Sequence, residues 1–199
     1  MDIDVPIREL NEVAVEPLRE AVLALPHSAW LENQNRQQDY DVHRRTESIV
    51  LLFTDGSGWP DITLTRESGW DLLGEVALPL MEDIIRRHYK PGGTIIRAMA
   101  AKLLPGEVIT PHRDAHPSFH HGHRIHIPLK TNPRVRFMIE GKPYKLQVGQ
   151  AYEINNQKTH SVMNKGSEER INFIFDYVPP ELVDNSVAPG GAQRQQMIS

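Results

Sequence analysis

The sequence predicts a mainly β protein of the jelly-roll kind, with a few helices ahead of the strands. Two observations carry this prediction: short runs with strand composition follow one another after Pro91-Gly92-Gly93, and turn-forming residues separate the runs. The runs are residues 94–104, 107–112, 123–130, 134–139, 144–147, 151–154, 159–164 and 170–177. Many short strands at this spacing favour a β-sandwich or barrel, and eight of them favour a jelly roll.

The segment before these strands predicts two helices and one further strand. Residues 14–25 carry apolar side chains at helical spacing and predict a short amphipathic helix. Residues 31–45 are polar and predict a loop, whereas the β-branched and apolar run 48–54 predicts a buried strand. Residues 70–89 again show helical spacing, and Pro79 is expected to break or kink that helix.

Length and composition favour a single domain. A chain of 199 residues with 39% hydrophobic residues can bury one sizeable core. We expect this domain to cover residues 1–187, with a helix and strand part at 1–93 and a catalytic β core at 94–180. Residues 188–199 are rich in Gly and Gln and predict a flexible C-terminal tail.

Composition also indicates which binding partners and which cellular compartment to expect. The formal net charge of −4 gives no reason to expect nucleic acid, whose binding proteins usually present a basic face. The absence of cysteine excludes disulfides and thiolate metal sites. No apolar run approaches the roughly 20 residues of a membrane span, and the acidic start lacks the pattern of a signal peptide. We therefore expect a cytoplasmic protein without nucleic-acid or membrane partners, of undetermined oligomeric state.

A candidate metal site centres on Pro111-His112-Arg113-Asp114. His112 and Asp114 are two residues apart, so in extended backbone both side chains leave the same face and can bind one ion together. His160, in a second strand-like segment, supplies a third ligand. Two imidazoles and one carboxylate on one side of a metal, with the other positions open, suit a non-haem Fe(II) centre that works on oxygen.

Arg170 follows His160 by ten residues and is the candidate anchor for a cosubstrate. If Gly166 centres a hairpin turn, residues 160 and 172 pair, and residue 170 lies on the same face roughly 6–7 Å along the strand. That separation suits a short dicarboxylate held by the metal at one end and by the arginine fork at the other.

At these residues the chain resembles the aspartyl/asparaginyl β-hydroxylases, a branch of the Fe(II)/2-oxoglutarate dioxygenases. The matching segments keep the family's order: 104–106, 111–114, 124–129, 149–152, 160–162, Asn164, Arg170 and 176–182. The resemblance implies a cupin-like double-stranded β-helix with helices buttressing one face. Animal members that hydroxylate growth-factor-like domains carry Gly where this chain has Asp114, so their substrate specificity is not carried over.

The resemblance also implies the chemistry and its cofactors. His112, Asp114 and His160 would hold Fe(II), Arg170 would bind 2-oxoglutarate, and Arg124 and His126 would contact the metal-side carboxylate of that cosubstrate. The implied reaction uses O₂, hydroxylates an amino-acid-like carbon, and yields succinate and CO₂. A free amino acid, a carrier-bound residue and an Asp- or Asn-type side chain in a peptide all remain open as substrates.

Two functions from other classes remain open at this point. The same ligands could form a non-catalytic, cupin-like sensor of a metal or ligand, or a Zn²⁺ site that activates water in a hydrolase. A hydrolase does not need a buried arginine beside the distal histidine, so Arg170 discriminates between it and an oxygenase.

Other polar residues in the β core have a structural interpretation. His116, His120, His121 and His123 lie in a loop without apolar periodicity, which is either a surface loop or a lid over the iron. Asn164 and Asp176 match the family's pattern. We expect both to be structural, because they lie at hairpin and strand ends.

Overall fold

The computed structural model describes residues 1–31, 46–58 and 60–184, and these residues form the strands of a β-sandwich. The strands are β1 (Ile7–Glu12), β2 (Thr46–Gly58), β3 (Asp61–Arg66), β4 (Thr94–Leu103), β5 (Val108–His112), β6 (His123–Lys130), β7 (Val135–Ile139), β8 (Lys142–Tyr144), β9 (Gln150–Ile154), β10 (His160–Asn164) and β11 (Arg170–Val178). The helices are α1 (Glu16–Ala24), α2 (His27–Leu31), α4 (Ser68–His88) and α5 (Pro180–Asp184), with a 3₁₀ turn η2 (Pro117–His120).

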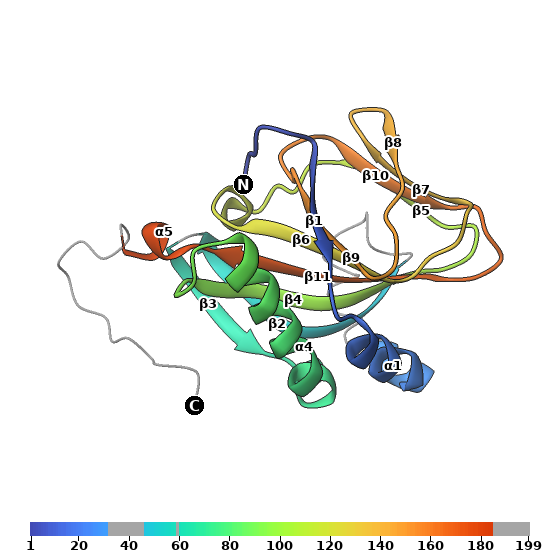
Figure 1. The fold of residues 1–199 in the computed structure, drawn as a ribbon, viewed down its shortest axis with the longest axis horizontal. Helices are drawn as coiled ribbons and strands as arrows, with labels where there is room; N and C mark the ends of the chain where they lie inside the picture. Colours follow the sequence, from blue (N-terminus) through green and yellow to red (C-terminus); the bar gives the residue numbers. More distant parts are fainter. Residues whose placement is uncertain (32–45, 59, 185–199) are drawn as a thin grey trace.

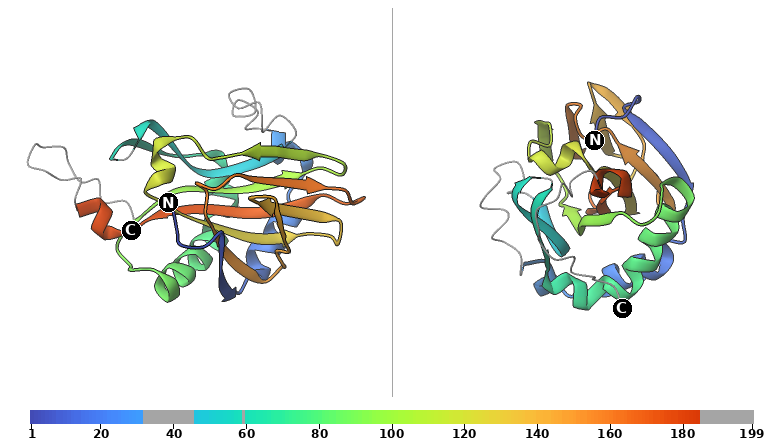
Figure 2. Two further views of the ribbon diagram at one scale, coloured as in Figure 1. Left: turned by 90° about the horizontal axis from the view of Figure 1, so that it is seen from above. Right: turned by 90° about the vertical axis from the view of Figure 1, so that its left-hand side faces the viewer.

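The strands form two antiparallel sheets that face each other (Figures 1 and 2). The larger sheet has seven strands in the order β1-β9-β6-β11-β4-β2-β3, and the smaller has four in the order β5-β10-β7-β8. From β4 to β11 the chain passes back and forth between the two sheets, with β7 and β8 together in the smaller one, as in a jelly roll. The predicted mainly β, cupin-like fold is confirmed.

Strand positions were predicted more accurately than their number. Seven of the eight strands predicted after residue 93 begin and end within one residue of the observed ones. The prediction of a strand at 144–147 was wrong, because β8 ends at Tyr144 and the chain then turns toward β9, with the Gln150 amide donating to the Gln147 carbonyl. Strands β1 and β3 were not predicted.

Helices α1 and α4 cover the outer face of the seven-stranded sheet (Figure 1). The break predicted at Pro79 does not occur, since α4 continues through it. Proline removes the amide that would bond the carbonyl of residue 75, and both Pro79 and Glu75 lie on the exposed side of the helix. Water can therefore bind the freed carbonyl, and the buried face of α4 still packs.

The prediction that the segment from β10 to β11 forms a hairpin was wrong. β10 pairs with β5 and β7 in the smaller sheet, whereas β11 pairs with β4 and β6 in the larger one. His160 lies opposite His112 and Ile139, and Asn172 lies opposite Ala101 and Pro128. The turn around Gly166 thus carries the chain from one sheet to the other, so His160 and Arg170 do not share a strand face.

The two faces of the larger sheet differ in character. Its outer face and the helices form the main apolar core. A smaller apolar cluster lies between the sheets and consists of Leu103, Phe137, Ile139, Tyr152, Ile154 and Val162. Beside this cluster the inner face buries polar side chains: Arg97, Arg124, His126, Arg170, Asn172 and Asp176. Buried ionisable groups are costly unless they are paired or used, so these residues mark the functional part of the fold.

Some sequence predictions lie outside the described residues. The predicted loop, except for Leu31, falls at residues 32–45, and the predicted tail at 188–199 falls within residues 185–199. Among the helices that are described, none has the length and apolar character needed to cross a membrane.

Candidate metal centre

A cavity of about 330 Å³ between the two sheets brings all the predicted site residues together. The smaller sheet contributes His112 on β5 and His160 on β10, and Asp114 comes from the chain just after β5. The larger sheet contributes Arg124, His126 and Arg170. The candidate metal ligands therefore face the predicted cosubstrate residues across the space between the sheets.

The three candidate ligands converge on one point. His160 on β10 lies opposite His112 on β5, and Asp114 follows two residues after β5 ends. Asp114 Oδ1 lies 3.8 Å from His112 Nε2 and 3.9 Å from His160 Nε2, and one ligand atom from each residue lies within 4.8 Å of the others. A single metal ion can bind three atoms this close together, and two imidazoles with one carboxylate suit Fe(II).

Both imidazoles are oriented by the backbone. The Nδ1–H of His112 donates to the Thr110 carbonyl at 2.8 Å, and the Nδ1–H of His160 donates to the Lys158 carbonyl at 2.9 Å. These bonds place the ring proton on Nδ1 and leave the Nε2 lone pair of each ring for a metal. Burial lowers the pKa of His160, which favours the neutral form that a metal requires. Phe137 stacks nearly parallel to the His160 ring, at 10°.

Arg124 belongs to a buried series of alternating charges. Its Nη1 lies 3.0 Å from Asp114 Oδ2 and 3.5 Å from Asp176 Oδ2, and Asp176 in turn lies 3.7 Å from Arg97. Burial opposes the charge on Arg124, but Asp114 and Asp176 outweigh it and raise the pKa of the guanidinium. Burial raises the pKa of Asp176, and Arg124 and Arg97 partly oppose that rise. This series fixes the carboxylate of Asp114 from the side opposite the histidines.

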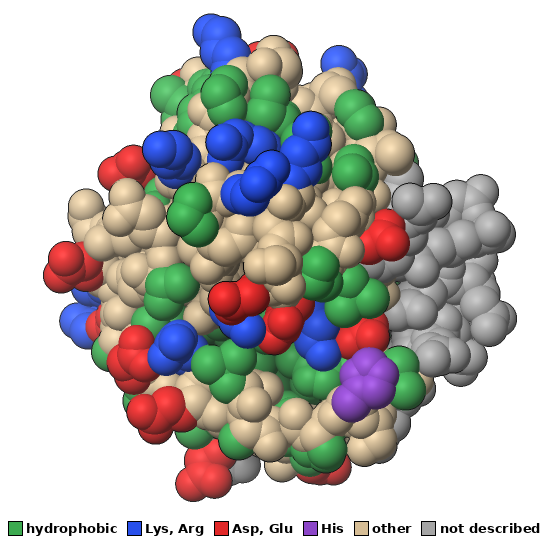
Figure 3. All heavy atoms as spheres, turned by 90° about the vertical axis from the view of Figure 1, so that its right-hand side faces the viewer, with side chains coloured by type: hydrophobic (Ala, Val, Ile, Leu, Met, Phe, Trp, Pro, Cys, Tyr) green, Lys and Arg blue, Asp and Glu red, His purple; other side chains and the backbone are tan. Residues whose placement is uncertain are grey.

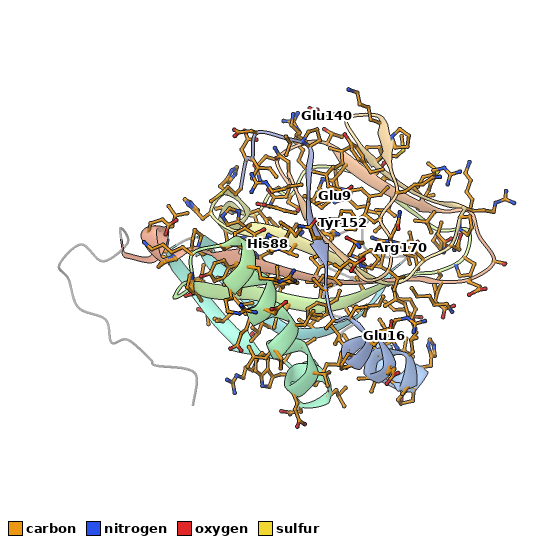
Figure 4. The ribbon with its side chains drawn as sticks, viewed as in Figure 1. Glu9, Glu16, His88, Glu140, Tyr152 and Arg170 are labelled. Carbon is orange, nitrogen blue, oxygen red and sulfur yellow. The ribbon has the colours of Figure 1, made fainter. Side chains whose placement is uncertain are left out.

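Arg170 differs from Arg97 and Arg124 because no carboxylate faces it. Within residues 1–31, 46–58 and 60–184 its side chain makes no ion pair, and its buried Nη2 has no hydrogen-bond partner. Burial alone lowers its pKa to about 10, so the group is still a cation at neutral pH. In Figure 4 Arg170 lies inside the sandwich, at the end away from His88. An unpaired guanidinium that lines the same cavity as a metal triad fits an anionic ligand with a carboxylate at its far end.

We predict that Arg170→Met stabilises the protein in the absence of ligands. Replacing a buried charge by an apolar side chain of similar length removes its desolvation cost, an effect of about 1–4 kcal/mol in buried ionic sites. At roughly 2–4 °C per kcal/mol for a chain of this size, thermal unfolding should show the gain clearly. A lower melting temperature in Arg170→Met would mean that the guanidinium stabilises the ligand-free fold.

His126 is held in its neutral form. Its Nδ1 accepts a hydrogen bond of 3.0 Å from the Asn172 amide, which leaves the proton on Nε2. Burial, together with the charges of Arg124 and Arg170, lowers its pKa well below 6.5. A neutral imidazole with a free Nε2–H can donate a hydrogen bond to a carboxylate without adding charge to the site.

The buried His126 predicts a pH-dependent stability. Its folded-state pKa lies below the unfolded value of 6.5, so the unfolded chain binds the proton more readily as pH falls. The stability that His126 contributes is present above pH 6.5 and is lost below it, by about 1.4 kcal/mol between about pH 7.5 and 5.5. Denaturant unfolding of the wild type and of His126→Gln at both pH values measures this difference. Equal losses in the two proteins would contradict the assignment.

Of the four loop histidines, only His116 lines the cavity. Its Nδ1 lies 2.7 Å from Ser118 Oγ and 3.3 Å from Arg97 Nη2. The neighbouring Phe119 also lines the cavity and lies under the guanidinium groups of Arg97 and Arg124, at 4.3 and 4.6 Å. The loop thus forms one wall of the cavity, and its η2 turn sets that wall.

Sequence reasoning missed Arg97, Phe119 and Phe137 as cavity residues. Arg97 carried a signal, because it is a lone charge in the apolar run 95–101. The aromatic residues carried none, since Phe137 is ordinary core for a strand and Phe119 lies in a loop without apolar periodicity. Asn164 is structural as expected: its side-chain amide donates to the carbonyls of Leu103 and Glu168, which ties the turn after β10 to the end of β4.

Comparisons with known proteins agree with this geometry. A family model described as aspartyl/asparaginyl beta-hydroxylase matches residues 17–180. A 2OG-Fe(II) oxygenase family oxidoreductase from Burkholderia pseudomallei has a similar structure, with 13% identity over 84% of this chain and 92% of that one and a TM-score of 0.51. A viral collagen prolyl hydroxylase from Paramecium Bursaria Chlorella virus-1, solved with 2OG, shows 11% identity over 88% and 97% of the two chains and a TM-score of 0.50.

The nickel complex of ThoJ, a non-heme monooxygenase, gives 14% identity over 88% of this chain and 74% of that one, with a TM-score of 0.52. Identities this low establish a shared fold and no more. No curated protein matches the chain.

Proposed function

Since the chain belongs to the aspartyl/asparaginyl β-hydroxylase family, we propose that it is an Fe(II)- and 2-oxoglutarate-dependent oxygenase that hydroxylates an amino-acid-like carbon. Succinate and CO₂ are the proposed coproducts. The substrate is a free amino acid, a carrier-bound residue, or an Asp- or Asn-type side chain in a peptide.

One observation carries this proposal. The His112, Asp114 and His160 triad and the unpaired guanidinium of Arg170 line a single cavity from opposite sides. A sensor of a metal alone, or a hydrolase that activates water, has no use for a buried cation in the same cavity as the triad. An oxoacid that binds the metal at one end and Arg170 at the other uses both.

In this proposal the triad holds Fe(II), with the Nε2 atoms of His112 and His160 and a carboxylate oxygen of Asp114 as ligands. When bound, the iron would let O₂ oxidise both partners, with one oxygen atom going to the substrate carbon as hydroxyl and the other to the oxoacid, which loses CO₂ and becomes succinate. Arg124 holds Asp114 in place by its ion pair, and the backbone carbonyls of Thr110 and Lys158 keep the imidazoles in the metal-binding tautomer.

The larger sheet orients the cosubstrate. Arg170 binds its distal carboxylate, and Arg124 with the neutral His126 faces the carboxylate nearest the metal. The rest of the cavity wall is largely apolar and includes Phe53, Met99, Ile109, Val162 and Ile174. These side chains exclude water from the reacting carbon and leave room beside the metal for a substrate.

The test is binding of the oxoacid to the iron-loaded protein under anaerobic conditions. Fe(II) plus 2-oxoglutarate should give a weak visible charge-transfer band, and Fe(II) alone should not. Screening amino acids and peptides for substrate-stimulated succinate production then identifies the substrate class. A protein that binds Fe(II) but develops no band with 2-oxoglutarate would overturn the proposed function.

A further inference from the structure

A second cavity, of about 450 Å³, meets the first at Arg170. Arg170 and Phe137 line both cavities, so these two side chains form part of the partition between them. Most of the remaining lining of the second cavity comes from two connecting segments, the β6–β7 turn at 131–133 and the chain after β8 at 145–148. The strands add Pro128, Val135 and Tyr144.

The two cavities open on different surfaces. The exposed residues that line the first cavity include Arg113 and Ala115, in the loop after β5. The exposed residues that line the second include Pro133, Lys145 and Val148, near β8 at the opposite edge of the four-stranded sheet. A molecule in the second cavity thus reaches Arg170 without passing through the first.

Cations surround the second opening. Lys145 lines it, and Arg134, Arg136 and Lys165 lie exposed in or beside the adjoining β6–β7 and β10–β11 turns. The side chains of Arg134, Lys145 and Lys165 make no ion pair with any residue that the structure describes, and Arg136 donates to backbone carbonyls. Figure 3 looks onto the end that carries these turns and shows lysine and arginine side chains gathered over its upper part, with acidic side chains below them. Such a field attracts anions and raises their rate of association.

We propose that the dicarboxylate cosubstrate, and the shorter dicarboxylate it leaves, pass between solvent and the metal through this second cavity. This inference rests on the proposed function. Arg170 is suited to such a passage because its guanidinium meets both cavities and no carboxylate competes for it among the described residues. An anion can therefore contact Arg170 from the outer side first and then move past it to the metal side.

The proposal has a functional consequence for the order of events. A substrate seated in the first cavity would block its opening, but the second opening would stay free. Cosubstrate exchange would then be independent of whether the hydroxylated product has left. An enzyme with only one opening would have to release that product first.

A cavity-filling variant tests the route. Val148 is 37% exposed at the rim of the second cavity, and Val148→Trp places a large ring there. Leu23→Trp is the matched control, since Leu23 is 40% exposed on α1 and lines neither cavity. Anaerobic stopped-flow mixing of the Fe(II) protein with 2-oxoglutarate gives the association rate constant, and displacement by excess succinate gives the dissociation rate constant.

A blocked route raises the barrier in both directions and leaves the bound state unchanged. We expect Val148→Trp to lower both rate constants by about tenfold with the dissociation constant unchanged, and Leu23→Trp to alter neither. Rate constants within about twofold of wild type in Val148→Trp would overturn the route, as would a changed dissociation constant with an unchanged association rate.

A charge reversal gives a second, independent readout. Lys145→Glu should lower the association rate constant about two- to fivefold at low salt, and added salt should remove the difference. Lys90→Glu makes the same change in net charge at the other end of β4 and should have little effect. Equal effects of the two variants would argue against a guided route.

These outcomes separate the two proposals. If the wild-type Fe(II) protein gives no charge-transfer band with 2-oxoglutarate, the proposed function fails. If the band forms but neither Val148→Trp nor Lys145→Glu alters its rate of appearance, only the route fails.

Discussion

Asp114→Ala should abolish iron-dependent turnover and weaken Fe(II) binding by at least about tenfold. The substitution removes a ligand whose Oδ1 lies within 4 Å of both Nε2 atoms, and it leaves the two imidazoles held by their backbone carbonyls. It also leaves Arg124 with Asp176 as its remaining carboxylate partner among the described residues. Equilibrium Fe(II) titration and succinate release measure the two effects, and circular dichroism checks the fold.

The matched control is Glu140→Ala, which removes an exposed carboxylate outside the cavity. It should bind Fe(II) and turn over as the wild type does. Asp114→Asn keeps the size of the side chain and separates loss of the ligand charge from loss of packing. Wild-type turnover in Asp114→Ala would remove Asp114 from the ligand set.

Arg170→Lys should raise the 2-oxoglutarate concentration needed for half saturation by about ten- to a hundredfold or more. The substitution keeps a positive charge but loses the planar fork, and with it one or two charge-assisted hydrogen bonds of roughly 1.5–3 kcal/mol each. Fe(II) binding should barely change, because Arg170 lies on the sheet opposite the triad. Titration of the anaerobic charge-transfer band measures the affinity directly.

The control for this prediction is Arg86→Lys, the same exchange at an exposed ion pair on α4. It should leave the affinity for 2-oxoglutarate unchanged. If both Arg170→Lys and Arg170→Ala bind 2-oxoglutarate as the wild type does, Arg170 has a structural role. The protein would then fit a metal sensor or a hydrolase better than an oxygenase.

Local patterns predicted the strands of the β core well. Turn formers such as Pro105-Gly106 and Asn132-Pro133 interrupt apolar runs, and because they restrict the backbone they mark strand ends reliably. Strand β1 was missed because exposed polar residues fill most of its positions. Strand β3 carries a short alternation of apolar and polar residues at Ile62 and Leu64, which was not used in the prediction. Both lie at edges of the seven-stranded sheet, where partners on one side alone hold them.

The structure brings the predicted site residues together in one cavity, but through a geometry that differs from the predicted one. A five-residue turn between β10 and β11 looks the same in sequence whether it closes a hairpin or crosses between sheets. The sheet that each strand joins depends on contacts with β4, β5, β6 and β7, which lie far away in the chain. Arg170 therefore faces the triad across the sandwich, and its lack of a carboxylate partner could be seen only in the folded protein.

The metal ligands and Arg170 lie on opposite sheets. The distance between the sheets therefore determines how long an oxoacid must be to reach both. Shifting an anchor along β11 to the next position on the same face would move it by about 6–7 Å, far more than one carbon of chain. Selectivity between oxoacids of neighbouring length should instead depend on the apolar residues that separate the sheets, among them Leu103, Phe137 and Val162. Substitutions that resize this spacer would change which oxoacid is accepted without touching any residue that binds it.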